Sequence, residues 1–270
     1  MLGQTPSPMK CEFYSLTHPG RVRDNNEDAV AVLPEVGLAL LADGMGGYNA
    51  GEVASAMAID YTGRQLGHWL GQSATSPKEA RRHMQSAVDT ANLAIYEAAR
   101  DNPAYRGMGT TLVMLVFLAN KVVVGHIGDS RAYRMRQGQL QRLTKDHSLL
   151  QEHMDAGLLS PAMAEVAHYK NLVTRAMGVD ARVQLDVSDH TVQDGDLYLM
   201  CSDGLSDMLS DFDLAELLTV GGDMPTVGQS LVDAANEAGG RDNISVVLVE
   251  CQAETTRPGL LTRLFTSNTA

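Results

Sequence analysis

The sequence predicts an α+β fold built from antiparallel β-sheets. Three observations support this class: short apolar runs typical of strands, turn residues between neighbouring runs, and longer helical patterns that occur in two pairs. In a doubly wound parallel sheet helices would alternate with single strands, whereas here strands follow one another directly. We expect one domain over 12–251, preceded by an N-terminal extension over 1–11 and followed by a flexible C-terminal tail over 252–270.

The first part of the chain predicts three strands and then two helices. Strands are expected over 12–17, 28–33 and 36–42, and the first helix over 52–70. The second helix begins with a capping box formed by Ser76 and Glu79, with Pro77 at the first helical position. One face of this helix is apolar and predicts a buried stripe: Met84, Val88, Ala91, Ile95 and Ala98.

The remaining elements are strands, a looser segment and a final pair of helices. Gln137-Gly138 is expected to be the turn of a hairpin, and Gly239-Gly240 to end the last helix. The segment 147–180 contains only short helical pieces. The expected strands are 110–118, 122–127, 131–136, 139–143, 183–187, 196–201 and 244–250, and the expected helices are 211–219 and 226–238.

Charge and composition exclude several classes of partner. Lys and Arg number 21 against 33 Asp and Glu, so the net charge is −12, which disfavours nucleic acid and anionic membranes. No apolar run is long enough to span a membrane, and the N-terminus lacks the pattern of a signal peptide. Cys11, Cys201 and Cys251 are widely spaced, which predicts neither a disulfide nor a zinc site and favours a cytoplasmic location.

Acidic residues recur where predicted strands begin or end. A single Asp-Gly is typical of a turn, as we expect for Asp194-Gly195. Several carboxylates at one edge of the core would repel one another unless cations neutralised them, and hard oxygen ligands suit Mg²⁺ or Mn²⁺. The acidic strand ends are Glu27-Asp28, Asp43-Gly44, Asp129-Ser130, Asp203-Gly204 and Asp242-Asn243.

Such a centre has a defined chemistry. Two bridged metal ions lower the pKa of a shared water and direct the resulting hydroxide at phosphorus. The substrate phosphate needs a cationic clamp, and an arginine fork suits it. Arg23 precedes Glu27 by four residues and is placed to supply that clamp.

Seven segments in order resemble the motif set of the metal-dependent Ser/Thr protein phosphatases of type 2C, with spacing similar to the compact bacterial branch. The resemblance covers about 12–250. The segments are Arg23-Asp24-Asn25-Asn26-Glu27-Asp28, Asp43-Gly44-Met45-Gly46-Gly47, Gly109-Thr110-Thr111, Gly128-Asp129-Ser130-Arg131, Thr174-Arg175-Ala176-Met177-Gly178, Ser202-Asp203-Gly204 and Arg241-Asp242-Asn243.

The resemblance implies a sandwich of two antiparallel sheets flanked by helices, and two or three Mn²⁺ or Mg²⁺ ions. Glu27, Asp43 and the Gly44 carbonyl would hold one ion, and Asp43, Asp203 and Asp242 the other. It further implies that Asp129 and Asp203 support a weaker third ion, that Asp28 hydrogen-bonds metal-bound water, that Arg23 grips the phosphate and that 147–180 forms a flap.

The implied activity is hydrolysis of phosphoserine and phosphothreonine in proteins, by a monomer that opposes a bacterial Ser/Thr kinase and acts on that kinase and its targets. Two alternatives stay open: a binding module that has lost catalysis, and a phosphatase dedicated to one phosphoprotein. Met45 stands where some family members carry a histidine proposed as general acid. We therefore expect the leaving-group proton to come from water at the third metal near Asp129.

Other possible motifs carry no function. The spacing Cys251-x5-Arg257 matches a cysteine phosphatase loop, but the residues between them include no glycine to cradle a phosphate. His126 and His147 are expected to make structural hydrogen bonds rather than to bind metal.

Overall fold

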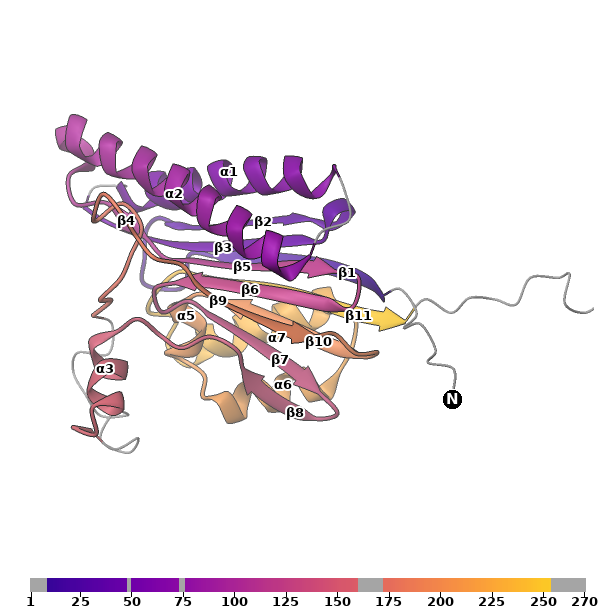
Figure 1. The fold of residues 1–270 in the computed structure, drawn as a ribbon. Helices are drawn as coiled ribbons and strands as arrows, with labels where there is room; N and C mark the ends of the chain where they lie inside the picture. Colours follow the sequence, from indigo (N-terminus) through magenta and orange to yellow (C-terminus); the bar gives the residue numbers. More distant parts are fainter. Residues whose placement is uncertain (1–8, 48–49, 73–75, 160–171, 254–270) are drawn as a thin grey trace, which may run out of the picture.

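Two antiparallel β-sheets pack face to face, with helices covering both outer faces, in the computed structural model of the chain (Figure 1). The structure describes residues 9–47, 50–72, 76–159 and 172–253. The expected tail over 252–270 falls outside the described residues from 254 onward, as do 160–171 of the expected flap. The α+β class and the four-layer arrangement are confirmed.

The first sheet has the strand order β1 (Met9–His18), β11 (Ile244–Ala253), β10 (Asp196–Cys201), β7 (Arg131–Arg136) and β8 (Gln139–Arg142). Its outer face contacts three helices: α5 (Asp203–Ser206), α6 (Asp211–Val220) and α7 (Met224–Glu237). Leu231, Leu248 and Tyr133 are fully buried in the apolar layer between these helices and the sheet.

The second sheet has the order β2 (Asp28–Leu33), β3 (Leu38–Met45), β5 (Leu112–Leu118), β6 (Lys121–Ile127) and β9 (Asp186–Thr191), with β4 (Gly109–Thr110) paired to β3. Helices α1 (Ala50–Leu70) and α2 (Pro77–Asp101) cover its outer face, and α3 (Leu149–Asp155) follows β8. Two short 3-10 helices, Pro34–Val36 and Pro103–Tyr105, complete the elements of the described residues.

A third apolar layer joins the two sheets through their inner faces. Leu41 and Val113 from the second sheet meet Tyr198 and Val247 from the first, and all four are fully buried. Burial on this scale contributes about 1.5–3 kcal/mol for each large side chain. This central layer holds the sheet ends in fixed positions relative to one another, which is what a site built from several strand ends requires.

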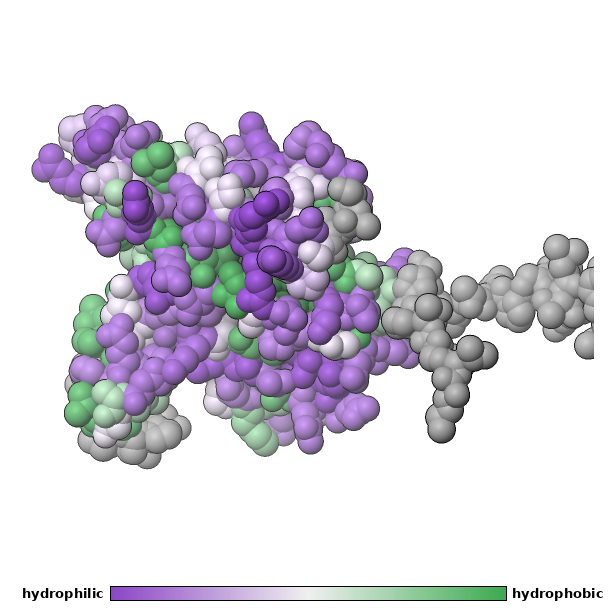
Figure 2. Space-filling view, viewed as in Figure 1, coloured by the Kyte–Doolittle hydropathy of each residue, from purple (hydrophilic) through white to green (hydrophobic). Residues whose placement is uncertain are grey.

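Local signals in the sequence placed the second helix and the hairpin correctly. Ser76 and Glu79 form the capping box, and Met84 and Ile95 are fully buried on the face that α2 turns to the sheet. The outward face of α2 is mostly hydrophilic, with apolar residues visible in the seam below it (Figure 2). Gln137 and Gly138 both have positive φ, as a two-residue hairpin turn demands.

The strand expected over 183–187 lies three residues later, at Asp186–Thr191. It is the edge strand β9, and its register pairs Asp186 with His126 of β6. The strand carries many polar side chains, so its sequence lacks the apolar pattern that predicts a strand. Two of its aspartates are paired with arginines: Arg175 bonds Asp186 and Arg81 bonds Asp189. Arg81 comes from α2, 108 residues before Asp189, whereas Arg175 lies only 11 residues before Asp186.

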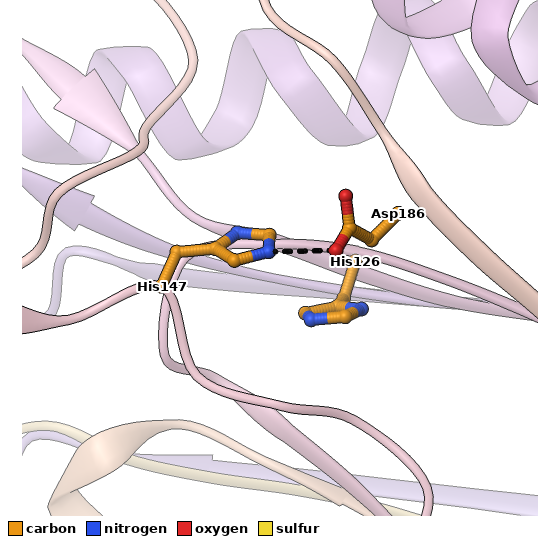
Figure 3. Close-up of side chains that lie close together, drawn as sticks. All are labelled: His126, His147 and Asp186. Atoms are coloured by element: carbon orange, nitrogen blue, oxygen red, sulfur yellow. Dashed lines mark hydrogen bonds and ion pairs between the residues drawn. The ribbon is translucent and has the colours of Figure 1, made fainter. Parts of the chain in front are cut away.

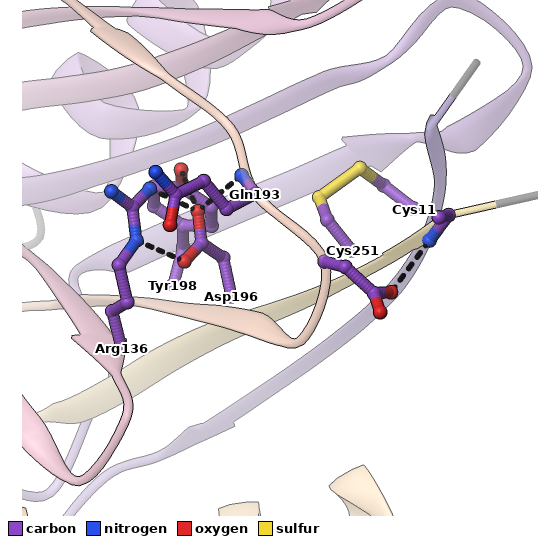
Figure 4. The surroundings of a disulfide bond; sticks show 8 residues. Cys11, Arg136, Gln193, Asp196, Tyr198 and Cys251 are labelled. Carbon is purple, nitrogen blue, oxygen red and sulfur yellow. Dashed lines mark hydrogen bonds and ion pairs between the residues drawn. A yellow bond between two sulfur atoms is a disulfide. The ribbon is translucent and has the colours of Figure 1, made fainter. Parts of the chain in front are cut away.

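A disulfide joins Cys11 of β1 to Cys251 of β11, close to one end of the first sheet (Figure 4). The expectation of no disulfide was therefore wrong. The two cysteines stand 240 residues apart but face each other in the antiparallel register, which spacing along the chain does not reveal. Cys201 is a buried free thiol. The cysteine argument for a cytoplasmic location falls with this correction, since disulfides are rare there.

At the same end of the sheet a fully buried carboxylate is completely paired. Asp196 accepts two hydrogen bonds of 2.6 Å from the guanidinium of Arg136 and others from Gln193 N and the Tyr198 hydroxyl (Figure 4). A buried charge is tolerated when it is paired in this way. The carboxylates at the opposite end of the sandwich are arranged differently.

In the described part of the chain, no helix has the length and apolar character needed to cross a membrane.

Candidate metal centre

Five aspartates and Glu27 gather at the end of the sandwich opposite the disulfide. Asp28 begins β2 and lies directly across from Asp43 on β3, and Asp129 follows β6. The last pair of β10 and β11 is Cys201 with Val246, so the residues that follow β10 and precede β11 meet at this edge. The structure thus brings together all the predicted acidic positions: Glu27, Asp28, Asp43, Asp129, Asp203 and Asp242.

The carboxyl groups are desolvated and repel one another. Burial raises the pKa of Asp43 well above its ordinary value, and repulsion from Asp28 and Asp203 adds to the rise. Burial is also the largest cause of the raised pKa of Asp203, and repulsion from Asp129 is the second. Burial raises the pKa of Asp28 to about 6, with Asp242 contributing. Such a cluster is unfavourable as bare carboxylates, so cations fit it.

One atom of the cluster is left without a partner. Oδ1 of Asp28 is buried and accepts no hydrogen bond from the described residues, while its Oδ2 accepts one of 2.8 Å from the Ser202 hydroxyl. A buried oxygen in this state costs about 1–3 kcal/mol. Together with the all-oxygen donor set, the orphan atom matches what hydrated Mg²⁺ or Mn²⁺ requires.

Backbone packing explains why the acidic segment carries glycines. A Cβ on Gly44 would lie 2.1 Å from the carbonyl oxygen of Gly51, and a Cβ on Gly51 would lie 2.7 Å from Oε2 of Glu27. The first turn of α1 therefore presses against both Glu27 and Gly44. The carbonyl of Glu27 is fixed in turn by Gly44 N–H and by the Ser55 hydroxyl, which donate to it.

Three residues that were not singled out from the sequence hold the ligand segments together. Asn243 accepts a bond from Glu27 N–H at 2.8 Å and donates to the carbonyls of Pro19 and Asn25. Thr111 accepts a bond from Asp43 N–H through its hydroxyl. Ser202 bridges Asp28 and Ser245 N–H. Each lies inside one of the quoted motif segments: Asn243 and Ser202 stand next to Asp242 and Asp203, whereas the segment of Thr111 contains no acidic residue.

Arg23 lies at the centre, where its Nη2 donates to Oδ2 of Asp242 at 2.6 Å. This bond raises the pKa of Arg23 above its ordinary value. The sequence prediction placed Arg23 on a phosphate, and the structure shows it on a carboxylate of the same cluster. The Arg23 side chain is 51% exposed, and an ion pair this exposed is worth at most about 1 kcal/mol. Exchange of the carboxylate for a phosphate is therefore inexpensive.

Asp129 lies beside the main cluster and repels two of its carboxylates, Asp43 and Asp203. Burial raises its pKa to about 6, followed by repulsion from Asp146, and its own charge is a leading cause of the raised pKa of Asp203. Met45 ends β3 next to Gly44, and its thioether has no proton to give. This charge interaction shows that Asp129 and Asp203 lie near each other.

A second group of titratable side chains lies nearby and resembles a metal site at first sight. His126, His147 and Asp186 each offer an atom within 4.8 Å of the others, with the imidazoles stacked (Figure 3). Their hydrogen bonds argue otherwise. Nδ1 of His147 accepts from Gly128 N–H, so Nε2 carries the proton and donates to Asp186. A metal at Nε2 would require the opposite tautomer. His126 in turn donates through Nε2 to the Lys145 carbonyl at 2.7 Å, so both imidazoles make the expected hydrogen bonds.

Comparison with known proteins identifies the family. The family described as "Protein phosphatase 2C" matches residues 20–241. Protein phosphatase PhpP of Streptococcus pneumoniae is 37% identical over 246 residues, spanning 90% of this chain and 98% of PhpP. The Streptococcus agalactiae serine/threonine phosphatase structure is 37% identical with a TM-score of 0.82, covering 88% of this chain and 98% of that one.

A further structure bears on the metal content of the relatives. The catalytic domain of the serine/threonine protein phosphatase PstP, solved in complex with 2 manganese ions, is 34% identical with a TM-score of 0.80. The alignment covers 90% of this chain and 99% of that domain. Family match, identity and fold agree over nearly the whole chain. The chain therefore belongs to the protein phosphatase 2C family.

Proposed function

We propose that this protein is a metal-dependent Ser/Thr protein phosphatase that uses two or three Mn²⁺ or Mg²⁺ ions. The observation that carries the proposal is the desolvated cluster of mutually repelling carboxylates at the sheet ends, with its orphan Asp28 oxygen. It is supported by relatives named as serine/threonine phosphatases and by the manganese bound to PstP. Divalent ions held here would lower the pKa of bound water and offset the charge of a phosphoryl group.

Each residue has a proposed part. Glu27, Asp43 and the Gly44 carbonyl hold one ion, whereas Asp43, Asp203 and Asp242 hold the other. Asp28 accepts from Ser202 through Oδ2, which leaves Oδ1 as the oxygen that would accept from water held by the ions. Arg23 leaves Asp242 to bind the substrate phosphate. Asp129, with Asp203, holds a weaker third ion.

The setting of the activity is also proposed. The enzyme acts as a monomer, opposes a Ser/Thr kinase, and takes that kinase and its phosphorylated targets as substrates. The segment 147–180 is a flap beside the centre. Its two described ends meet in an isolated bridge between Ser148 and Val173. This bridge places the entry and exit of the segment together.

The proposal is tested by following hydrolysis of nitrophenyl phosphate and of a phosphothreonine peptide in Mn²⁺ and in EDTA. Turnover in Mn²⁺ that EDTA abolishes is expected, because the carboxylates by themselves supply no Lewis acid. Undiminished activity in EDTA contradicts the metal mechanism. Binding of the peptide without turnover favours the binding module. Turnover confined to one phosphoprotein favours the dedicated phosphatase.

Replacement of Asp129 by Ala separates two kinds of substrate. Loss of turnover is expected to be roughly a hundredfold on alkyl phosphates such as phosphothreonine and several-fold on nitrophenyl phosphate. An alkoxide leaving group needs a proton that Met45 cannot donate, whereas nitrophenolate leaves without one. The measurement is kcat for both substrates at saturating Mn²⁺. Equal losses would show that the Asp129 side does not supply the proton.

A further inference from the structure

We infer that His147 is a positioning residue for Asp129: by holding the peptide of Gly128 from the root of the flap, it sets the affinity of the weakest metal site. The inference rests on the proposed metal-binding role of Asp129 and deepens it. His147 itself has no place among the proposed ligands. It acts through the backbone next to one of them.

His147 binds both backbone polar groups of Gly128. Its own N–H donates to the Gly128 carbonyl at 2.9 Å, and its Nδ1 accepts from the Gly128 N–H at 3.1 Å. The second bond requires a neutral imidazole with an unprotonated Nδ1. Burial, followed by the charge of the stacked His126, lowers the pKa of His147 and so favours this neutral form.

On its other side the Gly128 peptide presses against Thr111. Gly128 has a φ of +97°, and a Cβ there would lie 2.6 Å from the Thr111 methyl group. The Thr111 hydroxyl accepts from Asp43 N–H and pairs with Ser130 Oγ at 2.7 Å. The segment that carries Asp129 therefore packs between His147 and Thr111. Thr111 also binds the backbone of Asp43, the proposed bridging ligand.

His147 also contacts Asp186 of β9 and Thr174 of the flap. Nε2 donates to Asp186 Oδ2 at 3.2 Å, and Arg175 pairs with the other oxygen of Asp186 at 2.6 Å (Figure 3). The His147 carbonyl accepts from Thr174 N–H at 2.8 Å. One imidazole therefore connects the exit of the flap to the Asp129 segment. The Gly128 bond and the Asp186 bond use different nitrogens, so they can be removed separately.

Two amide variants separate these bonds. In His147→Asn the side-chain oxygen takes about the place of Nδ1, so it keeps the bond from Gly128 and loses Asp186. In His147→Gln the amide takes about the place of Nε2, so it keeps Asp186 and loses Gly128. Calorimetric titration with Mn²⁺ is expected to show the weakest phase weakened about tenfold in His147→Gln, in line with losses at groups that support metal ligands. The phase is retained in His147→Asn.

Asp129→Ala identifies the phase and keeps the two proposals apart. If this variant leaves every Mn²⁺ phase unchanged, the proposed role of Asp129 is wrong and the inference falls with it. If it removes the weak phase while His147→Gln leaves that phase unchanged, or while both amide variants weaken it equally, the inference alone is overturned. Should His147→Gln not fold, Asp186→Ala decides: an unchanged weak phase supports the inference, and a weakened one assigns the effect to the bond between His147 and Asp186 and overturns it.

Discussion

Replacement of Asp203 by Asn is expected to lower kcat by about a thousandfold on both nitrophenyl phosphate and a phosphothreonine peptide. Asp203 faces Asp129 and Asp242 in the carboxylate cluster, and the amide keeps its shape while removing the charge that attracts cations. Charge stabilisation by a bound metal is worth several kcal/mol, and about 4 kcal/mol corresponds to three powers of ten. Initial rates at saturating Mn²⁺ measure the loss.

The control for this variant lies at the opposite end of the sandwich. Asp194→Asn changes an aspartate whose Oδ1 accepts from Ala253 N–H, beyond the paired Asp196 and Cys251, and it should retain full activity. The melting temperature of Asp203→Asn in EDTA should equal or exceed that of the wild type, because the substitution removes a repelling buried charge. Full activity of Asp203→Asn would overturn the metal assignment.

Metal loading is expected to stabilise the protein strongly at pH 7.5 and weakly at pH 5. In EDTA, stability should fall as pH rises through this range. The folded-state pKa values of Asp28 and Asp129 are raised to about 6, so between about pH 4 and 6 the folded state retains protons that the unfolded state has released. Stability contributed by these protons is present at low pH and is lost as they dissociate.

Cations that take the place of those protons reverse the trend. Two sites each at a hundred times their Kd contribute about 5 kcal/mol, since one site contributes about 2.7 kcal/mol. For a chain of this size that corresponds to a rise in Tm of roughly 10 °C. Melting curves in EDTA and in Mn²⁺ at the two pH values check it. A Tm that does not respond to Mn²⁺ at pH 7.5 would count against the site.

The acidic cluster could be predicted from the sequence to a large extent because the proposed metal ligands sit on local signals. Asp43-Gly44 and Asp203-Gly204 adjoin apolar strands that are recognisable within a few residues. In an antiparallel pair the end of one strand lies beside the start of the other, as Asp43 near the end of β3 lies beside Asp28 at the start of β2. The capping box at Ser76 and the hairpin turn at Gly138 are equally local. For such features the chemistry of a short window decides the structure.

Other features depend on pairings that no window contains. Arg23 donates to Asp242, which lies 219 residues later, just before the start of β11. The polar strand β9 exists because α2 and the 172–180 segment bring Arg81 and Arg175 to its aspartates. His147 reaches Gly128 across 19 residues. These contacts arise only once the sheets have packed.

The sequence by itself determined the fold class, the acidic strand ends and hence the oxygen-ligand chemistry of this protein. Only the tertiary structure decided which carboxylates desolvate one another, which arginine pairs with which aspartate, and that Cys11 meets Cys251. The physical reason is that propensity, capping and turn chemistry act between neighbours in the chain. Burial, charge repulsion and antiparallel register act between residues that the chain keeps apart until it folds.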